Sequence, residues 1–470
     1  MQKRMPGKRL FASVLTVSGI SGCASYHPLP LPAHAQLVSR IDDVRHALPA
    51  AAGGEPQVID VDRPLSVDQI GLLAILNDPE LQAWHGESDL AQAGLTQSEV
   101  LPNPSVSLGY AALLGGPGTT DAFSASLSQD VKSLLTYRWR VVSASEHVSQ
   151  VNAELLWKEW QVAQKARLLA VDLYWGRLSI ERSEAALASV SHAASEVRAV
   201  VYKGEMSQSD LAPLLASKAG LEQSISSLRL AQIRNWQELD ALLGMTADAR
   251  FRITQPELPA MPSNLDAQIT ELPARRPDLI ALQLGYRSAD ADVRAAILGQ
   301  FPTLVLGGSW GSDTDAIRSG GPIVTFDLPI FDRNQGQVAK TRATRRLLHE
   351  QYQTRLDQVD STIRGLQVRS KQIATSLAVA REEAVSADEQ VECAREAYNQ
   401  GTLDQRAIID YESTALRTRI GVYDLERGLD ETRVALNLEL GAGLPRAQLV
   451  PLEPESAAGH PDASSREVRP

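Results

Sequence analysis

The stretch that decides the fold is residues 356–400, LDQVDSTIRGLQVRSKQIATSLAVAREEAVSADEQVECAREAYNQ. Its apolar and small residues alternate at spacings of three and four, which is the 3.5-residue period of a coiled-coil seam. The seam residues are Leu356, Val359, Ile363, Leu366, Ser370, Ile373, Leu377, Ala380, Ala384, Ala387, Val391, Ala394 and Tyr398. No proline occurs between Pro329 and Pro445. We therefore predict one helix over about 337–400, roughly 95 Å long at about 1.5 Å per residue. Such a helix needs neighbours along its whole length.

A second helix with the same seam precedes it, from about 137 to 201. Its seam residues are Val162, Ala166, Leu169, Leu173, Gly176, Ile180, Ser183, Leu187, Val190, Ala194, Val197 and Val201. Shifted by 197 residues, this seam falls on the later one, with Ile180 on Leu377 and Val190 on Ala387. Each long helix ends at a glycine, Gly204 or Gly401, and a shorter helix returns from there. The shared register predicts a duplicated unit.

Each copy also contains a predicted β-hairpin between a proline-led helix and the long helix. The motif Asp78-Pro79-Glu80-Leu81 returns as Arg276-Pro277-Asp278-Leu279. Alternating apolar and polar runs follow, at about 103–131 and 302–330, each interrupted by a glycine-rich segment (115–118 and 320–322) that we predict to be the hairpin loop. The larger apolar residues of these runs are Leu108, Tyr110, Phe123, Leu306 and Trp310. We expect them to face lipid, with serine and threonine facing water.

The fold class predicted is mainly α with a small β part, built from a repeated helix–β-hairpin–long helix–helix unit. Repeat 1 spans 76–245, with helices at about 137–243, and repeat 2 spans 276–442, with helices at about 337–440. We expect residues 23–75 to be an extended lead-in and equatorial segment, 246–275 a proline-rich linker or equatorial segment, and 443–470 an equatorial remnant followed by a disordered tail. Four strands cannot close a barrel, and open strand edges are not tolerated in lipid, so we expect several copies to share one barrel.

The N-terminal residues 1–22 are typical of an export signal, with basic residues before an apolar run too short to span a bilayer. The junction Ile20-Ser21-Gly22-Cys23 resembles the bacterial lipobox, whose cysteine is acylated and becomes the first residue. Ala24 after it implies sorting to the outer membrane. We predict a lipid anchor at Cys23. Cys393, the other cysteine, then has no partner for an intramolecular disulfide, and its role stays open.

Composition excludes several other functions. The formal charge is −11, and we find no basic cluster past the first ten residues, which argues against nucleic-acid binding. The eight histidines show no paired spacing, so we expect no metal site and no cofactor. Residues 307–311 match the pattern G-x-S-x-G, but a further strand follows where a hydrolase needs a helix. We therefore expect no enzymatic activity, and energy coupling must come from a partner.

Over nearly its whole mature length the chain resembles the TolC family of outer-membrane efflux proteins. The resemblance rests on the duplicated unit, the lipobox, the paired proline boundaries, the tip pattern Tyr398-x-x-Gly401 and the closing pairs Leu243-Gly244 and Leu440-Gly441. It implies a homotrimer with a 12-stranded outer-membrane β-barrel and a long α-helical coiled-coil tunnel. It also implies an exit duct of a tripartite efflux system, with a periplasmic adaptor protein and an inner-membrane transporter of the RND type as partners. Residues 327–336 are similar to the signature of the heavy-metal (cobalt–zinc–cadmium) branch; from the residues alone they are a turn with Asp332 or Asn334 as helix N-cap.

The resemblance also assigns roles at the predicted tip of the helices. Asp410 matches an acidic position of the periplasmic aperture, with Asp210 as its counterpart in repeat 1 and Tyr398 beside it. Ala407 stands where the family carries a second acidic residue, so the paired acidic ring is incomplete. The tip turns and adaptor-facing residues would be Gly204, Met206, Ser207, Gly401, Thr402 and Leu403. The alternative to a channel is a lipid-anchored periplasmic coiled-coil scaffold or adhesin without a pore, which would not need the hairpins.

Overall fold

The computed structural model describes residues 26–47, 58–262, 264–444, 446–447 and 449. The chain divides into two units, 1–37 and 38–470. The described residues of the first unit, 26–37, contain no helix or strand. All elements discussed below belong to the second unit. The predicted export signal and Cys23 lie outside the described residues.

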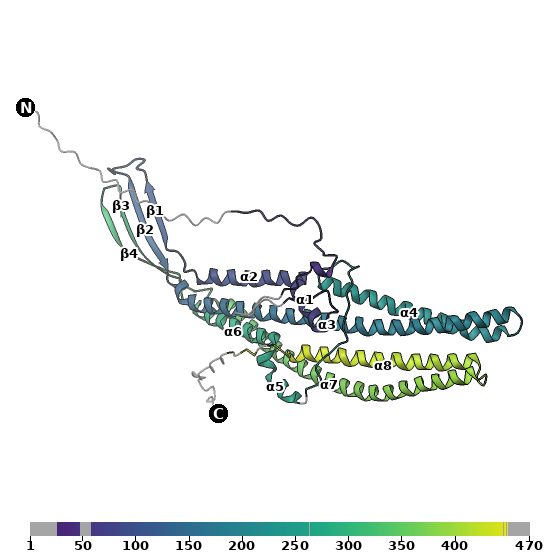
Figure 1. Ribbon diagram of the computed structural model, residues 1–470. Coiled ribbons are helices and arrows are strands. Elements are labelled where there is room, and N and C mark those ends of the chain that lie inside the picture. The colour runs from purple at the N-terminus through teal and green to yellow at the C-terminus, as the bar shows by residue number, and fades with distance from the viewer. Residues whose placement is uncertain (1–25, 48–57, 263, 445, 448, 450–470) are drawn as a thin grey trace, which may run out of the picture. The chain divides into compact units, whose positions relative to one another are not determined.

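The second unit is built twice from the same elements (Figure 1). The first copy contains α2 (Pro79–Glu99), β1 (Ser105–Ala111), β2 (Ala122–Asp130), α3 (Lys132–Tyr202) and α4 (Gln208–Leu242). The second contains α6 (Pro277–Leu298), β3 (Leu304–Ser312), β4 (Arg318–Phe326), α7 (Gln335–Asn399) and α8 (Gln405–Leu440). Two shorter helices, α1 (Val67–Asn77) and α5 (Leu265–Arg275), precede α2 and α6, and a 3₁₀ turn, η1, covers Ile41–Asp43. The predicted fold class, mainly helical with a small β part, is confirmed.

The long helices form two antiparallel hairpins, α3 with α4 and α7 with α8, and α3 also packs against α1, α2, α6 and α8. The four strands form one sheet in the order β1-β2-β3-β4. Figure 1 shows the sheet at one end of these helices and the hairpin turns at the other. None of the helices within the described residues is long and apolar enough to cross a membrane.

The predicted heptad seams are confirmed along most of both long helices. In α7, Val359, Ile363, Ser370 and Leu377 are buried, and so are the seam alanines at positions 384, 387 and 394. The seam fails at its last position, because Tyr398 remains 39% exposed. Tyr398 is the last residue but one of α7.

The largest core surrounds the ends of the hairpins where α1 packs. It contains Leu65, Ile70, Leu73, Leu173 and Leu239, each at most 1% exposed. A smaller core around α5 is built from residues of α5, α6, α7 and α8, such as Leu272 and Ile363. Full burial of one such side chain stabilises the fold by about 1.5–3 kcal/mol. These two cores hold the helices together at the level of α1 and α5.

The segments before and between the copies are more ordered than predicted. The lead-in pairs through isolated bridges, Val38 with Met245 and Leu65 with Ile253, and buries Val44. The proline-rich linker contains α5, with Pro273 in its last turn. Proline content misled the prediction here, because the linker forms a helix in spite of Pro273 and the lead-in forms its bridges at residues other than proline.

The predicted loop at 320–322 is also wrong, because Gly320, Gly321 and Pro322 lie inside β4. The turn is formed instead by residues 313–317, where Asp313 Oδ1 accepts hydrogen bonds of 2.9 Å from the backbone N–H groups of Asp315 and Ile317. Gly320 stands opposite Trp310 in the sheet, and a Cβ there would lie 3.3 Å from the indole ring. The glycine therefore makes room for an aromatic neighbour.

Candidate functional site

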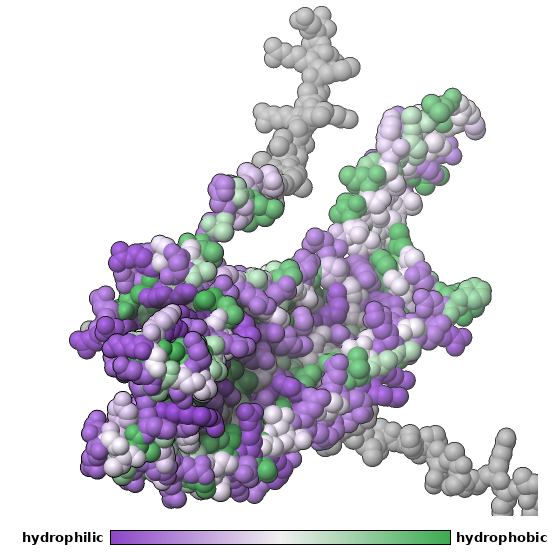
Figure 2. Space-filling model, turned by 90° about the vertical axis from the view of Figure 1, so that its right-hand side faces the viewer, coloured by the Kyte–Doolittle hydropathy of each residue, from purple (hydrophilic) through white to green (hydrophobic). Residues whose placement is uncertain are grey.

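The sheet has one apolar and one polar face, as the alternation predicted. Directly paired residues share a face of a sheet, so Leu108, Ala125, Trp310 and Gly320 form one row. The apolar face carries Val106, Leu108, Tyr110, Phe123, Leu127, Leu306 and Trp310, all exposed. The opposite face carries Ser105, Ser107, Ser124, Ser126, Ser128 and Ser309. Figure 2 shows apolar residues on the projecting sheet, whereas the helices are mostly hydrophilic outside.

Both outer strands of this sheet have a free edge. β1 pairs only with β2, and β4 only with β3, within the described part of the chain. Every residue of β4 is exposed. An exposed strand edge offers unpaired N–H and C=O groups to another chain, so the sheet is incomplete as a single copy.

The hairpin turns at the far end are built identically in both copies. Gly204 and Gly401 adopt the left-handed conformation, with φ of 79° and 73°. In the first turn Glu205 N–H donates to Val200 O, and in the second Thr402 N–H donates to Ala397 O, at 3.2 and 3.0 Å. The N–H group of each glycine also donates a hydrogen bond, to the carbonyl group three residues earlier. The two hydrogen bonds at each turn together form the Schellman motif that ends a helix. Glycine is required at both turns by its backbone conformation.

The next helices start with side-chain caps that involve one of the predicted aperture residues. Ser207 is the N-cap of α4, and Asp210 Oδ2 accepts a 3.0 Å hydrogen bond from the Ser207 N–H in return. Asp404 caps α8 by accepting from Ala407 N–H at 2.8 Å. The 197-residue offset places Asp210 on Ala407, not on Asp410. Asp210 therefore has a structural role that sequence reasoning missed.

Asp410 differs from Asp210, because its carboxylate is exposed and makes no hydrogen bond or ion pair within the described residues. It lies in the second turn of α8, next to the buried Ile409. Met206, Ser207 and Thr402 are exposed at the turns and Leu403 is half-buried. These side chains stand where a binding partner can reach them, and their roles at the aperture stay predictions.

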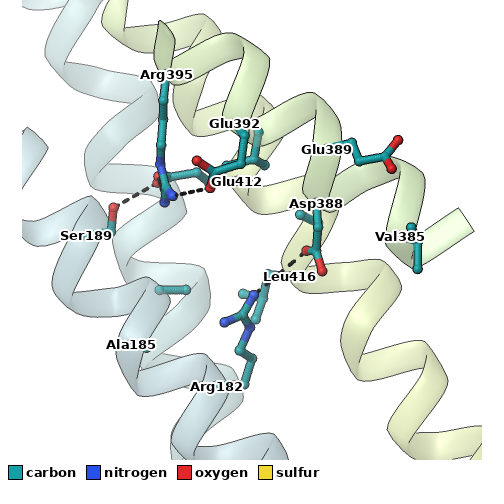
Figure 3. A pocket seen from close by; sticks show the side chains of 13 residues that line it. Arg182, Ala185, Ser189, Val385, Asp388, Glu389, Glu392, Arg395, Glu412 and Leu416 are labelled. Atoms are coloured by element: carbon teal, nitrogen blue, oxygen red, sulfur yellow. Dashed lines mark hydrogen bonds and ion pairs between the residues drawn. The ribbon is translucent and has the colours of Figure 1, made fainter. Parts of the chain in front are cut away.

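A cavity of about 590 Å³ lies between the two hairpins, on the side of the turns that leads toward the sheet (Figure 3). Arg182 of α3 points across it to Asp388 of α7, which Arg419 of α8 also binds. Glu412 of α8 accepts hydrogen bonds from Ser189 of α3 at 2.8 Å and Arg395 of α7 at 2.9 Å. The hairpins are thus joined across the cavity by polar contacts, which the seam analysis could not predict because these residues lie off the seam.

Two pairs of residues that include acidic groups link the hairpins farther from the turns, one buried (Trp175 and Asp430) and one half-buried (Asp172 and Glu431). Trp175 Nε1 of α3 donates a 3.0 Å hydrogen bond to Asp430 Oδ2 of α8. Burial raises the pKa of Asp172 in α3 to about 7, and its neighbour Glu431 of α8 adds to the effect. Burial and this like-charged neighbour from the other hairpin both favour the protonated form of Asp172.

The stretch 327–336 leaves the sheet and begins α7. Asn334 holds the N-cap position, but its side chain does not cap the helix, contrary to one expectation. It adopts a left-handed φ of 60°, and its amide donates a 2.8 Å hydrogen bond to Ala296 O in α6. Asp332 Oδ1 accepts from the Asn334 N–H at 2.8 Å. These contacts tie the strand-to-helix turn to the preceding helix.

The remaining motifs contribute no chemistry to the site. The G-x-S-x-G pattern lies within β3, so Ser309 is a strand residue paired with Ser126 and not the tip of a nucleophile turn. Among the described residues, no three His, Cys, Asp or Glu side chains gather closely enough to hold a metal ion. Cys393 is exposed on α7.

Comparison with known proteins defines the class. Residues 269–442 match the family model described as outer membrane efflux protein. The chain is 25% identical over 374 residues to the cobalt-zinc-cadmium resistance protein CzcC of Cupriavidus metallidurans, covering 76% of this chain and 85% of that protein. Its fold is similar to the crystal structure of CusC, with a TM-score of 0.67 and 16% identity over 80% of this chain and 92% of that one. The Campylobacter jejuni CmeC outer membrane channel gives a TM-score of 0.66 and 17% identity, covering 80% and 86%.

The fold and the sheet thus define a channel protein of the efflux type. Residues 269–442 match the outer membrane efflux protein family, and the resemblance inferred from the sequence is confirmed. Its location is the outer membrane. The family is a class of transport channels and not of enzymes.

Proposed function

We propose that three copies of the chain form the outer-membrane exit duct of a tripartite efflux system. The observation that carries this proposal is the sheet, which exposes an apolar face and two free edges. Three copies would supply twelve strands, and pairing β4 of one copy with β1 of the next would remove every free edge. Strands of seven to nine residues approach the length needed to cross the membrane when tilted.

The helical hairpins extend this duct on the other side of the membrane. α3 has 71 residues and α7 has 65, so each is roughly 100 Å long at about 1.5 Å per residue. Two hairpins per copy would give six per trimer, enclosing a tunnel as the family does. The acyl group on Cys23 would add a lipid anchor to the barrel.

The hairpin turns are the surface we assign to a periplasmic adaptor protein, with Met206 and Leu403 as apolar contacts. An inner-membrane transporter of the RND type would supply the energy for export, because a passive duct cannot drive transport by itself. Asp410 would narrow the aperture, since three exposed carboxylates in a ring attract cations and repel one another. This role would fall to Asp410 alone, because the Asp210 carboxylate is engaged in the cap of α4.

The cargo we propose is heavy-metal ions, a proposal supported by the similarity to CzcC, whose name records cobalt, zinc and cadmium resistance. Small toxic compounds are the competing cargo. Deletion of the gene should sensitise the host to these metals, with wild-type resistance restored by the full chain. Sensitivity to organic toxicants alone would assign the other cargo.

The channel itself is tested by gel electrophoresis and conductance. The purified chain should migrate as a trimer that dissociates on heating, and should conduct ions in planar bilayers. A water-soluble monomer after removal of the lipid anchor, without conductance, would instead identify a tethered coiled-coil scaffold or adhesin.

A further inference from the structure

The first turns of α7 carry a basic cluster, which corrects the expectation that no such cluster exists past residue ten. Residues 333–349 contain Arg333, Lys340, Arg342, Arg345 and Arg346 and no acidic residue. The whole chain has a formal charge of −11, so this local excess is opposite to the general balance. Fixed charges of one sign attract ligands of the other.

The fold does not require these arginines, because the first copy does without them. The 197-residue offset matches Arg342 to Ser145, Arg345 to Val148 and Arg346 to Ser149. The helix backbone is the same at both places, in α3 and in α7. The helix itself therefore does not need these charges.

Three of these arginines converge on one hollow. A cavity of about 260 Å³ is lined by Tyr286 of α6 and by Arg342, Arg345, Arg346 and His349 of α7. The positions in α7 are spaced by three, one and three residues, so they share one side of the helix. Guanidinium groups of this kind bind phosphate oxygens through paired N–H donors.

The positive charge of the residues that line the cavity exceeds the negative charge of the carboxylates that pair with them. Arg345 Nη1 binds Asp290 Oδ1 at 2.6 Å, but Arg294 also binds Asp290, at 3.0 Å. The guanidinium groups of Arg342 and Arg346 make no hydrogen bond or ion pair within the residues that the structure describes. The two guanidinium groups are thus available to an anion.

The position of the cluster along α7 indicates the source of that anion. The turn before α7 exposes Leu328, Ile330 and Phe331, the last of them 91% exposed, between the sheet and the helix. Arg342 is seven residues into α7, about 10 Å along its axis. Helical side chains lean toward the N-terminal end, so the arginines extend back toward this apolar turn.

We propose that Arg342, Arg345 and Arg346, with Tyr286 and His349, bind the phosphate group of an anionic phospholipid where the sheet meets the helices. The inference rests on the proposed function, because only a sheet within the membrane brings headgroups to this level. Free inorganic phosphate offers the same chemistry and is the competing source. The bound headgroup would hold the second copy at a fixed depth in the inner leaflet.

The test uses the full chain in neutral detergent, titrated with phosphatidylglycerol or phosphatidylcholine, with bound lipid measured by native mass spectrometry. The variant Arg342→Ser/Arg346→Ser installs the residues of the first copy and should bind phosphatidylglycerol roughly 30-fold more weakly at low ionic strength, at about fivefold per arginine. Phosphatidylcholine binding should not change. The control Arg198→Ser/Arg406→Ser removes two exposed charges near the turns, and should bind like the wild type.

Equal phosphatidylglycerol binding by the variant and the wild type would overturn the inference, and so would an equal loss in the control. Displacement of the lipid by millimolar inorganic phosphate, with phosphate bound in its place, would reassign the cavity to free phosphate. Conductance of the same samples separates the two proposals. A conducting wild type without lipid selectivity refutes the headgroup site alone, whereas a non-conducting monomer refutes the proposed channel.

Discussion

The guanidinium carbon of Arg276 lies 4.4 Å from the centroid of a Trp157 ring, so a helix start in one copy is stacked on the long helix of the other. Arg276 is fully buried and donates to Asp278 Oδ1 and Oδ2 at 2.9 and 2.7 Å and to Glu439 Oε2 at 2.6 Å. Arg355 of α7 binds Asp278 as well, at 2.7 Å. Burial alone would raise the pKa of Asp278, but the two arginines outweigh it and hold that pKa below its ordinary value. The cluster joins α3, α6, α7 and α8.

Removal of Arg276 should therefore destabilise the chain strongly. Arg276→Met removes the fully buried guanidinium between the half-buried carboxylates of Asp278 and Glu439. Glu439 then loses its arginine and Asp278 keeps only Arg355, at a cost of about 3–5 kcal/mol in the free energy of unfolding. Chemical denaturation followed by circular dichroism measures it. The control Arg364→Met breaks pairs of a half-exposed side chain and should cost at most about 1 kcal/mol. Similar losses in both variants would contradict a special role for the buried cluster.

The pKa of Asp172, raised to about 7 by burial and by Glu431, predicts a pH dependence. In the unfolded chain this carboxyl has its ordinary value of 3.8. Between these two values the folded chain keeps a proton that the unfolded chain has lost, so this contribution to stability falls as the pH rises from about 4 to about 7. Between pH 5 and pH 8 the melting temperature of the wild type should fall by a few degrees more than that of Asp172→Asn. The exposed control Asp357→Asn should follow the wild type; parallel curves for all three would exclude the raised pKa of Asp172.

Alanine should change the stability of the chain in opposite directions at a turn glycine and at a glycine inside a helix. Gly401→Ala forces a Cβ into a left-handed backbone, with φ of 73°, and should cost about 1–2 kcal/mol although no atom lies near the added methyl. Gly421→Ala lies within helix α8 with equally open space, and should stabilise by about 0.5–1 kcal/mol. Denaturation midpoints of the two variants should move in opposite directions. Movement in the same direction would mean that the turn does not depend on glycine.

The proposed aperture predicts a change in conductance without a change in stability. Asp410→Ala removes an exposed, unpaired carboxylate and should raise single-channel conductance in planar bilayers, with an unaltered melting temperature. The control Asp424→Ala removes a carboxylate of the same helix farther from the turn and should leave conductance unchanged. Asp210→Ala should instead lower stability, by about 0.5–2 kcal/mol, because it breaks a capping box. Unchanged conductance in Asp410→Ala would count against the aperture.

The predicted lipid anchor has a direct test as well. Cys23→Ser should abolish labelling of the chain with a radioactive or clickable fatty acid in the bacterial host. Cys393→Ser is the matched control, because Cys393 is exposed on a helix and should not be acylated. Labelling that survives Cys23→Ser would refute the anchor.

Periodic features were predictable because each depends on local spacing. The seam spacing of α7 and the shared 197-residue register indicated two long helices, and burial of residues such as Ile363 and Ala384 agrees. The glycines that end the long helices were predictable because the left-handed turn favours one residue type. Strand alternation likewise indicated the two faces of the sheet.

Features that depend on contacts across the chain were missed. The glycines at 320 and 321 were assigned to a loop because glycine is common in turns, but both pair with β3, where Gly320 lies opposite Trp310 and Gly321 opposite Ser309. Asn334 was expected to cap its own helix, yet its amide reaches α6. The basic residues 340–346 were overlooked within an acidic chain, although their spacing on one helix face was a readable signal.

By itself, therefore, the sequence determined the two long helices, their glycine turns, the hairpins and the family, because heptad spacing, glycine backbone freedom and strand alternation are properties of neighbouring residues. Only the tertiary structure decided which polar groups meet. Arg276 and Asp278 could be read as a helix start, but their burial against Trp157 and Glu439 depends on helices from distant parts of the chain. The same holds for Asp172 beside Glu431, because a carboxyl group loses water and gains a like-charged neighbour only when the two hairpins pack together.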